Sequence, residues 1–366
     1  MQAQSPSSAL WKLLLAGLFF GVVASLLVYA GNPGNMGVCV ACFLRDITGA
    51  FGGSAAGMGA LAYLRPELPA LVLGAAGAAV ASGQFRPRGG VAVLPRFVLG
   101  FVFMVAALVF LGCTVRVWLR VGGGDLNAVV GAVGLVAGIA VGAAVLRSGY
   151  ALPASREVSL PAALAVPGIA IVLLAIALLT GGAPAFLTVA PAVKRAPIAI
   201  SLVAGLALGV VAQRSRLCTT GGIRDVILWR RPEKLLGIAG LVAGALAANA
   251  VLGQLRFGFE GQPIAHTDAL TNFASTAVAG LAAVLMGGCP LRQLVMAGEG
   301  DAGAGGALAG MVAGALFAHG ARLASSPKGP ASGALPLLAV LAAVTLALAW
   351  YLRRQQATSA AAAPDA

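Results

Sequence analysis

The stretch Gly31-Asn-Pro-Gly-Asn-Met-Gly-Val-Cys-Val-Ala-Cys-Phe-Leu-Arg-Asp46 decides how the chain folds. It follows an apolar run, Leu13 to Ala30, that is long enough to cross a bilayer at about 20 residues per helical span. The Gly, Asn and Pro residues break that helix, and a second helical pattern starts near Met36, with Cys39 and Cys42 just inside its first turn. A charged pair such as Arg45 and Asp46 costs about 2.5–3.5 kcal/mol per charge at membrane depth and persists only where it faces protein or water. We therefore interpret the stretch as a re-entrant half-helix that lines a pathway.

The composition predicts an all-α polytopic membrane protein. Of the 366 residues, 60% are hydrophobic and 10% are charged, and the mean hydropathy is +0.96. Apolar runs long enough for helices recur from end to end, so the lipid bilayer is the expected surrounding. The 51 glycines suit helices that pack closely in lipid through small residues. The N-terminal run is longer than the apolar core of a usual signal peptide, and we interpret it as the first transmembrane helix.

The net charge of +13 calls for a physical explanation. Its basic residues are scattered among the apolar runs and form no stripe with interleaved aromatic residues, which argues against nucleic acid as a partner. Two causes remain, namely topology signals in short loops and attraction of an anionic substrate. We expect both to contribute.

Beyond the first helix, apolar runs alternate with polar or Pro/Gly-bearing connectors. The tail at 355–366 is rich in alanine, and we predict it to be disordered. The predicted runs lie at about 50–63, 68–82, 96–112, 126–146, 161–180, 197–213, 235–255, 270–287, 303–323 and 334–352.

Two sequence matches at nearly one offset indicate an internal duplication. The segment Cys39-Val-Ala-Cys-Phe-Leu-Arg-Asp-Ile47 aligns without gaps with Cys218-Thr-Thr-Gly-Gly-Ile-Arg-Asp-Val226, 179 residues later. The segment Gly112-Cys-Thr-Val-Arg116 aligns with Gly288-Cys-Pro-Leu-Arg292, 176 residues later. We predict two pseudo-symmetric transmembrane repeats at 1–182 and 183–366. Repeats with broken helices at matching positions are typical of transporters, and we favour an inverted arrangement, although the runs do not fix the number of crossings per half.

Each of the four breaks combines small residues, a cysteine and a short helical piece that carries an arginine. A cysteine at a helix N-terminus lies beside unpaired N–H groups and the positive end of the helix dipole, an environment that attracts anions and favours thiolate. Three breaks contain Cys-x-x-Arg, a spacing that places both side chains on one helix face. The candidate pathway residues are Cys39, Cys42, Cys113, Cys218 and Cys289, and the supporting residues are Asn32, Asn35, Arg45, Asp46, Arg116, Thr219, Arg224, Asp225 and Arg292.

Plainer interpretations apply to several of these residues. A single free cysteine is often just a small buried apolar side chain. We expect the adjacent Arg-Asp pairs, 45–46 and 224–225, to be structural ion pairs rather than ligands. Glu299 and Asp301 follow the fourth break. Two roles are open to them, neutralising nearby arginines or proton coupling, but we expect a solvated loop. We predict no catalytic residue, no metal ligand and no cofactor.

The breaks resemble those of the YeeE/YedE family of bacterial membrane proteins, also called the sulfur-transport domain family. The 31–46 stretch is most similar to the YedE branch, which is associated with selenium metabolism. The resemblance implies a bacterial inner-membrane protein whose two halves form an hourglass, with thiosulfate passing a constriction lined by cysteines and a TusA-like sulfur carrier acting on the cytoplasmic side. By motif these cysteines are Cys39, Cys113, Cys218 and Cys289. The extra Cys42 leaves a selenium species or another reduced sulfur species open as the substrate.

Three functions compete at this point. We favour a transporter, not an enzyme, for a small sulfur- or selenium-containing anion. A membrane thiol-disulfide oxidoreductase would use Cys39-x-x-Cys42 as a redox pair, yet the second half has no matching pair, and no quinone or haem ligands are evident. A passive channel or structural membrane partner would need no cysteine at the breaks.

Overall fold

The computed structural model describes residues 6–52, 58, 61–181 and 193–361, and nearly all regular structure in this part is helical. Two short strands, β1 (Arg88–Gly89) and β2 (Arg156–Glu157), pair antiparallel. The first seven helices are α1 (Pro6–Tyr29), α2 (Val40–Ala50), α3 (Glu67–Ala81), α4 (Val93–Phe110), α5 (Thr114–Gly122), α6 (Leu126–Arg147) and α7 (Leu160–Leu179). The next seven are α8 (Ile198–Ser215), α9 (Thr219–Trp229), α10 (Leu235–Val251), α11 (Ala269–Leu285), α12 (Pro290–Gly298), α13 (Ala302–Gly320) and α14 (Ala334–Ala361).

Within the described residues, eight helical segments are long and apolar enough to cross a membrane. Three of them, Val93–Gly122, Ile198–Trp229 and Ala269–Gly298, join a long helix to a short one across a break. Two further apolar helices, α3 and α10, are shorter. These segments confirm a multi-pass helical membrane protein.

Most predicted apolar runs coincide with a helix, and the differences lie at their ends. The run predicted at 50–63 overlaps the end of α2, but its residues 53–57 and 59–60 lie outside the described part, as does the predicted repeat boundary at 182. The chain was predicted to become disordered at Gln355, whereas α14 continues to Ala361. Alanine and glutamine are strong helix formers, and Gln356 donates a hydrogen bond to Ala151 O. Residues 362–366 are outside the described part.

Four long helix pairs form the frame of the bundle: α1–α10, α3–α8, α4–α13 and α6–α11. Each joins one of the first seven helices to one of the second seven. Their glycines set the spacing, since a Cβ on Gly134 would lie 2.2 Å from Phe273 O and a Cβ on Gly138 would lie 1.8 Å from Ala277 O. From the first contact to the second, the residue number rises by four in both helices, so α6 and α11 run parallel. Close backbone approach through small residues is how helices associate in lipid.

The same register holds in a second pair. A Cβ on Gly17 would lie 2.1 Å from Gly237 O, and one on Gly21 would lie 2.3 Å from Leu241 O. Helices α1 and α10 are therefore parallel as well, and both end at the same side of the bundle.

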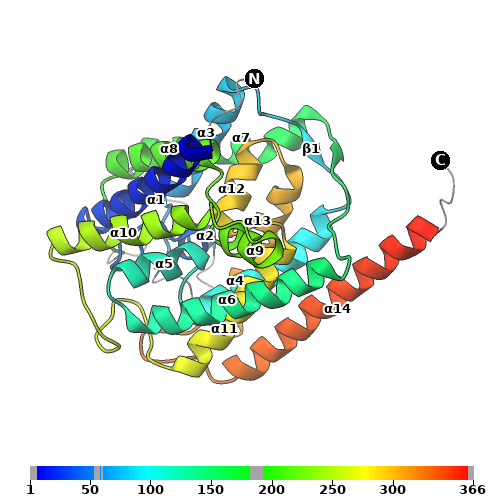
Figure 1. Cartoon of the computed structure of the whole chain (residues 1–366). Helices are drawn as coiled ribbons and strands as arrows, with labels where there is room; N and C mark the ends of the chain where they lie inside the picture. The colour runs from blue at the N-terminus through cyan, green and yellow to red at the C-terminus, as the bar shows by residue number, and fades with distance from the viewer. Residues whose placement is uncertain (1–5, 53–57, 59–60, 182–192, 362–366) are drawn as a thin grey trace.

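One end of the bundle, which we call the basic end, gathers several connections. The β1–β2 pair lies there, the guanidinium of Arg147 at the end of α6 donates to Ile227 O near the end of α9, and α14 reaches it through the Gln356 hydrogen bond. Figure 1 shows α14 along one edge of the molecule, ending near the C-terminus. The cations of these segments are Arg86, Arg88, Arg147, Arg156, Arg214, Arg216, Arg230, Arg231, Lys234, Arg353 and Arg354.

The opposite end is built from the loops at 30–38, 61–66, 122–126, 193–197, 252–268 and 322–330. Ala196 N donates to Asn32 Oδ1 at 2.9 Å, and Ser325 N donates to Leu108 O at 3.2 Å, so these loops are joined to one another and to the helix ends beneath them. The cations of this end outside the helix breaks are Arg65, Lys194, Arg195, Arg256, Arg322 and Lys328.

The short helices α2, α5, α9 and α12 lie within this frame. Figure 1 places α2, α9 and α12 in the middle of the view, with longer helices such as α1, α6 and α10 around them. Helices of 9 to 11 residues are too short to cross a bilayer, so at least one end of each lies inside the protein.

A substitution at Gly138 tests the close helix packing. Gly138→Val places a side chain against the backbone of α11, and overpacking of this kind costs about 1–3 kcal/mol. We expect a lower thermal unfolding temperature in detergent, read by intrinsic fluorescence. Gly77→Val is the matched control, because Gly77 in α3 has no atom within 4 Å of its Cβ position. Equal unfolding temperatures for the two variants would contradict the packing described here.

Candidate functional site

All four short helices begin at a cysteine. Cys39, Cys113, Cys218 and Cys289 are the N-cap residues of α2, α5, α9 and α12, each with extended backbone angles. In two of them the sulfur serves as the cap, since Cys39 Sγ accepts from the backbone N–H of Cys42 at 3.4 Å and Cys218 Sγ accepts from that of Gly221 at 3.2 Å. Each cysteine therefore lies at the positive end of a helix dipole.

The start of α2 differs from the prediction. The second helical pattern was expected to start near Met36 with Cys39 inside its first turn, but the helix begins at Val40. Asn35 and Gly37 adopt positive φ angles of 56° and 36°, which interrupt the helical path before Cys39. The consequence is that Cys39 caps the helix instead of lying on its side.

The cysteines meet as two sulfur pairs. Cys39 Sγ lies 3.7 Å from Cys113 Sγ, and Cys218 Sγ lies 3.5 Å from Cys289 Sγ. All five cysteines are free thiols. Each pair joins two different short helices, so the pairing depends on the tertiary fold.

A pair of threonines connects the two sulfur pairs. Thr114 follows Cys113 and Thr219 follows Cys218, and Thr219 Oγ1 donates to Thr114 Oγ1 at 3.2 Å. The four N-cap cysteines predicted from the sequence are thus brought together in one cluster. Thr219, predicted as a supporting residue, lies within it.

The two sulfur pairs head helices that run in opposite directions. Helices α9 and α12 run towards the basic end. There, Ile227 O of α9 accepts a hydrogen bond from the guanidinium of Arg147, and Glu299 O after α12 accepts one from the backbone N–H of Arg86. Helix α5 runs to the opposite end, where Gly123 O accepts from Arg256 N at 3.0 Å. The α2 segment reaches the same end, because Asp46 near its C-terminus bonds Arg65, which donates to the carbonyl of Lys194.

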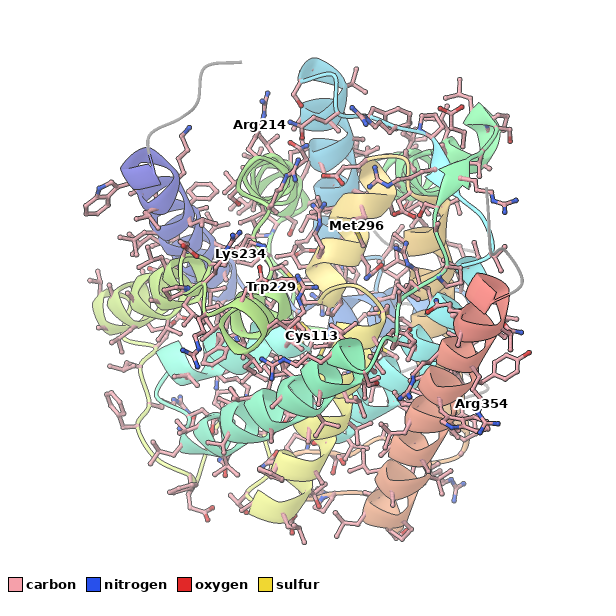
Figure 2. The ribbon with its side chains drawn as sticks, turned by 45° about the vertical axis from the view of Figure 1, so that its right-hand side comes forward. Cys113, Arg214, Trp229, Lys234, Met296 and Arg354 are labelled. Atoms are coloured by element: carbon pink, nitrogen blue, oxygen red, sulfur yellow. The ribbon has the colours of Figure 1, made fainter. Side chains whose placement is uncertain are left out.

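The cluster is closed to solvent on one side. Cys39, Cys113 and Cys289 have no exposed surface, whereas Cys218 is partly exposed. Figure 2 shows Cys113 near the centre of the molecule, with Trp229 and Lys234 of the α9–α10 region above it. Access to the sulfurs in this conformation is therefore greatest at Cys218.

Cys42 has an environment of its own. Its Sγ lies 3.8 Å from Leu111 O and 3.6 Å from Arg116 Nη1. The same guanidinium donates to the carbonyl oxygens of Leu111, Asn35 and Ile264. Arg116 thus holds the backbone of two breaks together and places a positive charge beside a thiol.

The other arginines of the breaks bind carboxylates. Arg292 makes two hydrogen bonds to Glu299, of 3.1 and 3.2 Å. Cys-x-x-Arg predicted only that the two side chains share a helix face, and the partners differ, since Arg116 contacts a thiol and Arg292 a carboxylate. Spacing along a helix sets the direction of a side chain, but it does not set what the side chain meets.

The predicted Arg-Asp ion pairs are confirmed, and each has a further cation. Arg45 lies 2.6 Å from Asp46 Oδ1, and Arg65 lies 2.8 Å from Asp46 Oδ2. In the second half, Arg224 lies 2.8 Å from Asp225. The sequence analysis missed Arg65, although it stands just before α3.

The additional cation of the second half is Lys234, at 2.5 Å from Asp225 Oδ2. It stands directly before α10, as Arg65 stands just before α3. A cation immediately before the next long helix is the shared signal that could have found both residues.

The two asparagines predicted as supporting residues, Asn32 and Asn35, form hydrogen bonds between loops of the opposite end. Asn32 Nδ2 donates to Glu67 Oε1 at 2.9 Å, and its Oδ1 accepts from Ala196 N. Asn35 Nδ2 donates to Gln262 Oε1 at 3.4 Å. Both side chains therefore have protein partners and lie away from the sulfur pairs.

Glu299 and Asp301 were expected in a solvated loop, and this was wrong. They are 5% and 3% exposed. Glu299 pairs with Arg292, and Asp301 pairs with Arg88 and Arg96 at 3.2 and 2.9 Å. The two arginines that pair with Asp301 lie more than 200 residues before it in the chain. The polar sequence around Asp301 therefore gave no sign that this carboxylate is buried.

Two titratable groups of the loop before α11 were not part of the predicted site. Burial lowers the pKa of His266, so this imidazole is neutral near pH 7 and adds no positive charge to the opposite end. Hydrogen bonds from Thr271 lower the pKa of Asp268, which caps α11. Neither group contacts a cysteine through a hydrogen bond recorded among the described residues.

Fold and site together define a multi-pass helical membrane protein with a buried cysteine cluster. A scan against protein-family models gave no match, and a search of the curated proteins gave none either.

Thiol labelling tests the geometry of the cluster. N-ethylmaleimide applied briefly to the purified protein should modify Cys218 first, because it alone among the described cysteines is partly exposed. Peptide mass spectrometry measures the order of modification. Cys218→Ser should remove the fast-labelled peptide and leave the others slow. Fast labelling of Cys39 or Cys113 in the folded protein would contradict the closed cluster.

Proposed function

We propose that the protein moves a small sulfur- or selenium-containing anion across the membrane through the four N-cap cysteines. One observation carries this proposal, namely that four buried helix N-termini, each capped by a cysteine, meet as two sulfur pairs joined by Thr114 and Thr219. The resemblance to the YeeE/YedE family points the same way and stays a prediction.

The chemistry of the cluster suits an anion with soft atoms. Helix N-termini present unpaired N–H groups and partial positive charge, which favour anions. The buried hydroxyl of Thr220 in the first turn of α9 has no hydrogen-bond partner within the described residues and is available as a further donor. Thiols are weak donors and polarisable acceptors, so each contact with sulfur or selenium is weak. Several weak sites in series allow both binding and release.

Matching helix pairs support two pseudo-symmetric repeats. Helices α1 to α7 correspond in order to α8 to α14, and the short helices, of 11 and 9 residues, stand at the same places in both series. The pair α1–α10 has its counterpart in α8–α3, and the pair α4–α13 in α11–α6. The sulfur pairs correspond too, since the Cys39–Cys113 pair matches the Cys218–Cys289 pair.

An inverted arrangement follows from parity. Each proposed repeat has five longer helices and two short ones. With five crossings per repeat, the second repeat starts from the opposite side of the membrane. The parallel packing of α1 with α10 supports this, because α3, the counterpart of α10, returns across the membrane after α1. The short helices are then re-entrant half-helices.

The mechanism is a passage between the paired sulfurs. An anion loses part of its water, meets Cys39 and Cys113, passes the two threonines and reaches Cys218 and Cys289. The thiols keep their protons and donate S–H contacts to the anion, so no covalent bond forms. Because three of the four N-cap cysteines have no exposed surface, the short helices must separate slightly for the anion to pass.

An oxidoreductase that uses Cys39 and Cys42 fits the geometry less well. Exchange requires a thiolate to attack a disulfide sulfur of a partner, and both of these cysteines are fully buried. Cys42 donates to a backbone carbonyl and lies against Arg116, while Cys39 contacts Cys113 on another helix. Among the described residues, neither sulfur has exposed surface that a partner protein could reach.

Charge suggests the orientation in the membrane. The basic end carries roughly twice as many loop and helix-end cations as the opposite end, and cytoplasmic loops are enriched in Lys and Arg. We therefore place the basic end in the cytoplasm, with the start of α1 and the end of α14 on that side. By the resemblance, the membrane is a bacterial inner membrane and a TusA-like carrier would meet the protein at this end.

Cysteine variants test the transport proposal. Cys39→Ala and Cys289→Ala each remove one sulfur of a pair, and we expect uptake of thiosulfate or selenite to fall at least about tenfold, the effect of losing one or two polar contacts in a narrow passage. Uptake is measured with labelled anion in cells that lack other importers. Cys42→Ala separates the alternatives, since an oxidoreductase requires it to cycle and the proposed transporter does not. Full uptake by both Cys39→Ala and Cys289→Ala would refute the proposal.

Reporter fusions test the orientation. A fluorescent protein fused after residue 366 should fold and fluoresce in the cytoplasm, and alkaline phosphatase at the same point should be inactive. Alkaline phosphatase inserted after Lys328, in a loop of the opposite end, should be active. The reverse pattern would overturn the proposed orientation.

A further inference from the structure

We propose a second anion site, separate from the sulfur pairs, in a cavity of about 530 Å³ at the opposite end. It would take a small oxyanion such as sulfate or thiosulfate. Five polar residues carry the argument, namely Arg45, Asp46, Arg65, Lys194 and Ser325, all of which line the cavity. The role of this site as a waiting position for transport rests on the proposed function, whereas anion binding itself does not.

The cavity walls carry an excess of positive charge. Arg45 and Arg65 are 5% and 2% exposed, and both pair with the carboxylate of Asp46. Two guanidinium groups thus share one negative charge, and Lys194 adds a third cation to the lining. The two arginines are buried and Lys194 is exposed, so the excess of cations in the lining is open to solvent on the Lys194 side and can attract a mobile anion.

A further carboxylate, Glu67, is linked to Arg65 through Asn32, which accepts from Arg65 and donates to Glu67. Glu67 is buried behind the cavity, where its Oε1 accepts hydrogen bonds from Asn32 and Ser201, both at 2.9 Å. It is not among the residues that line the cavity. Within the lining, three cations face a single carboxylate.

An unpartnered hydroxyl independently points to a ligand. Ser325 is 9% exposed, and its backbone N–H is held by Leu108 O. Its Oγ has no hydrogen-bond partner within the described residues. His319 also lines the cavity, and its Nε2 likewise has no hydrogen-bond partner within the described residues. Buried polar atoms normally have partners, and an oxyanion in the cavity would accept from this hydroxyl.

The matching charged group of the second half is more exposed to solvent than the group of Arg45, Asp46 and Arg65. There, Arg224 and Lys234 flank Asp225 in the same manner, but their side chains are 23% and 43% exposed. Water can screen that group, which lies at the basic end. The group of Arg45, Asp46 and Arg65 is enclosed, so its surplus charge acts through a low dielectric medium. The difference favours anion capture at the opposite end.

The cavity ends beside the helix break that carries Cys113. Leu111 lines the cavity, and its carbonyl accepts from Cys42 and from Arg116. An anion held by the cavity would therefore be adjacent to the first sulfur pair. Planar guanidinium groups and a hydroxyl suit an oxyanion with several acceptor oxygens better than a halide.

Binding to the purified full-length protein tests this site. Thiosulfate and sulfate are titrated by calorimetry in detergent, with sodium chloride as a competitor. Lys194→Gln removes one lining cation and Ser325→Ala removes the unpartnered hydroxyl, and we expect each to weaken binding about tenfold. Lys328→Gln is the matched control, because it removes a cation from the same end without lining this cavity. Ser325→Ala removes one atom and adds none, so its folding is not at risk.

The outcomes separate this inference from the proposed function. Wild-type affinity in both cavity variants, or chloride competing as well as sulfate, would overturn the oxyanion site while leaving cysteine-dependent uptake intact. Cavity-dependent binding with uptake that is indifferent to Cys39→Ala and Cys289→Ala would support the site and remove the transport proposal. Binding that survives Cys289→Ala but falls in Lys194→Gln supports a site distinct from the sulfur pairs.

Discussion

The capping of helix ends inside the bilayer is the constraint on which the structure depends. Four short helices begin within the protein, where lipid offers no partner for the unpaired N–H groups of their first turns. The sulfurs of Cys39 and Cys218 accept two of these groups. Bringing the four ends together makes one buried region of positive potential that is lined by thiols. The proposed affinity for a soft anion is a consequence of this arrangement.

Ion pairs hold the far ends of the same helices. Asp46 binds Arg45 of α2 and Arg65 just before α3, and Asp225 binds Arg224 of α9 and Lys234 just before α10. Glu299, at the end of α12, binds Arg88 of β1 and Arg292 from the first turn of its own helix. In α5, Arg120 pairs with the fully buried Asp125 at 2.7 Å. Each short helix is thus anchored at its charged C-terminal side, while its cysteine end meets the others. Glycine-packed long helices surround this assembly and keep it rigid.

The two ends of the molecule differ although their helices correspond. At the basic end the ion group around Asp225 is partly exposed and Cys218 is the accessible sulfur. At the opposite end the group around Asp46 is enclosed and the Cys39–Cys113 pair is fully buried. A transporter needs such a difference at any moment, since a passage open at both ends would be a channel.

The sequence by itself determined the multi-pass helical class, the positions of the breaks and the adjacent Arg-Asp ion pairs, because apolar length, Gly/Pro interruptions and neighbouring charges are local properties. It also indicated that the cysteines belong at the breaks. Only the tertiary structure decided that Cys39 meets Cys113, 74 residues away, and that Glu299 and Asp301 are buried. Such contacts depend on how distant helices pack, and local sequence patterns do not encode that packing.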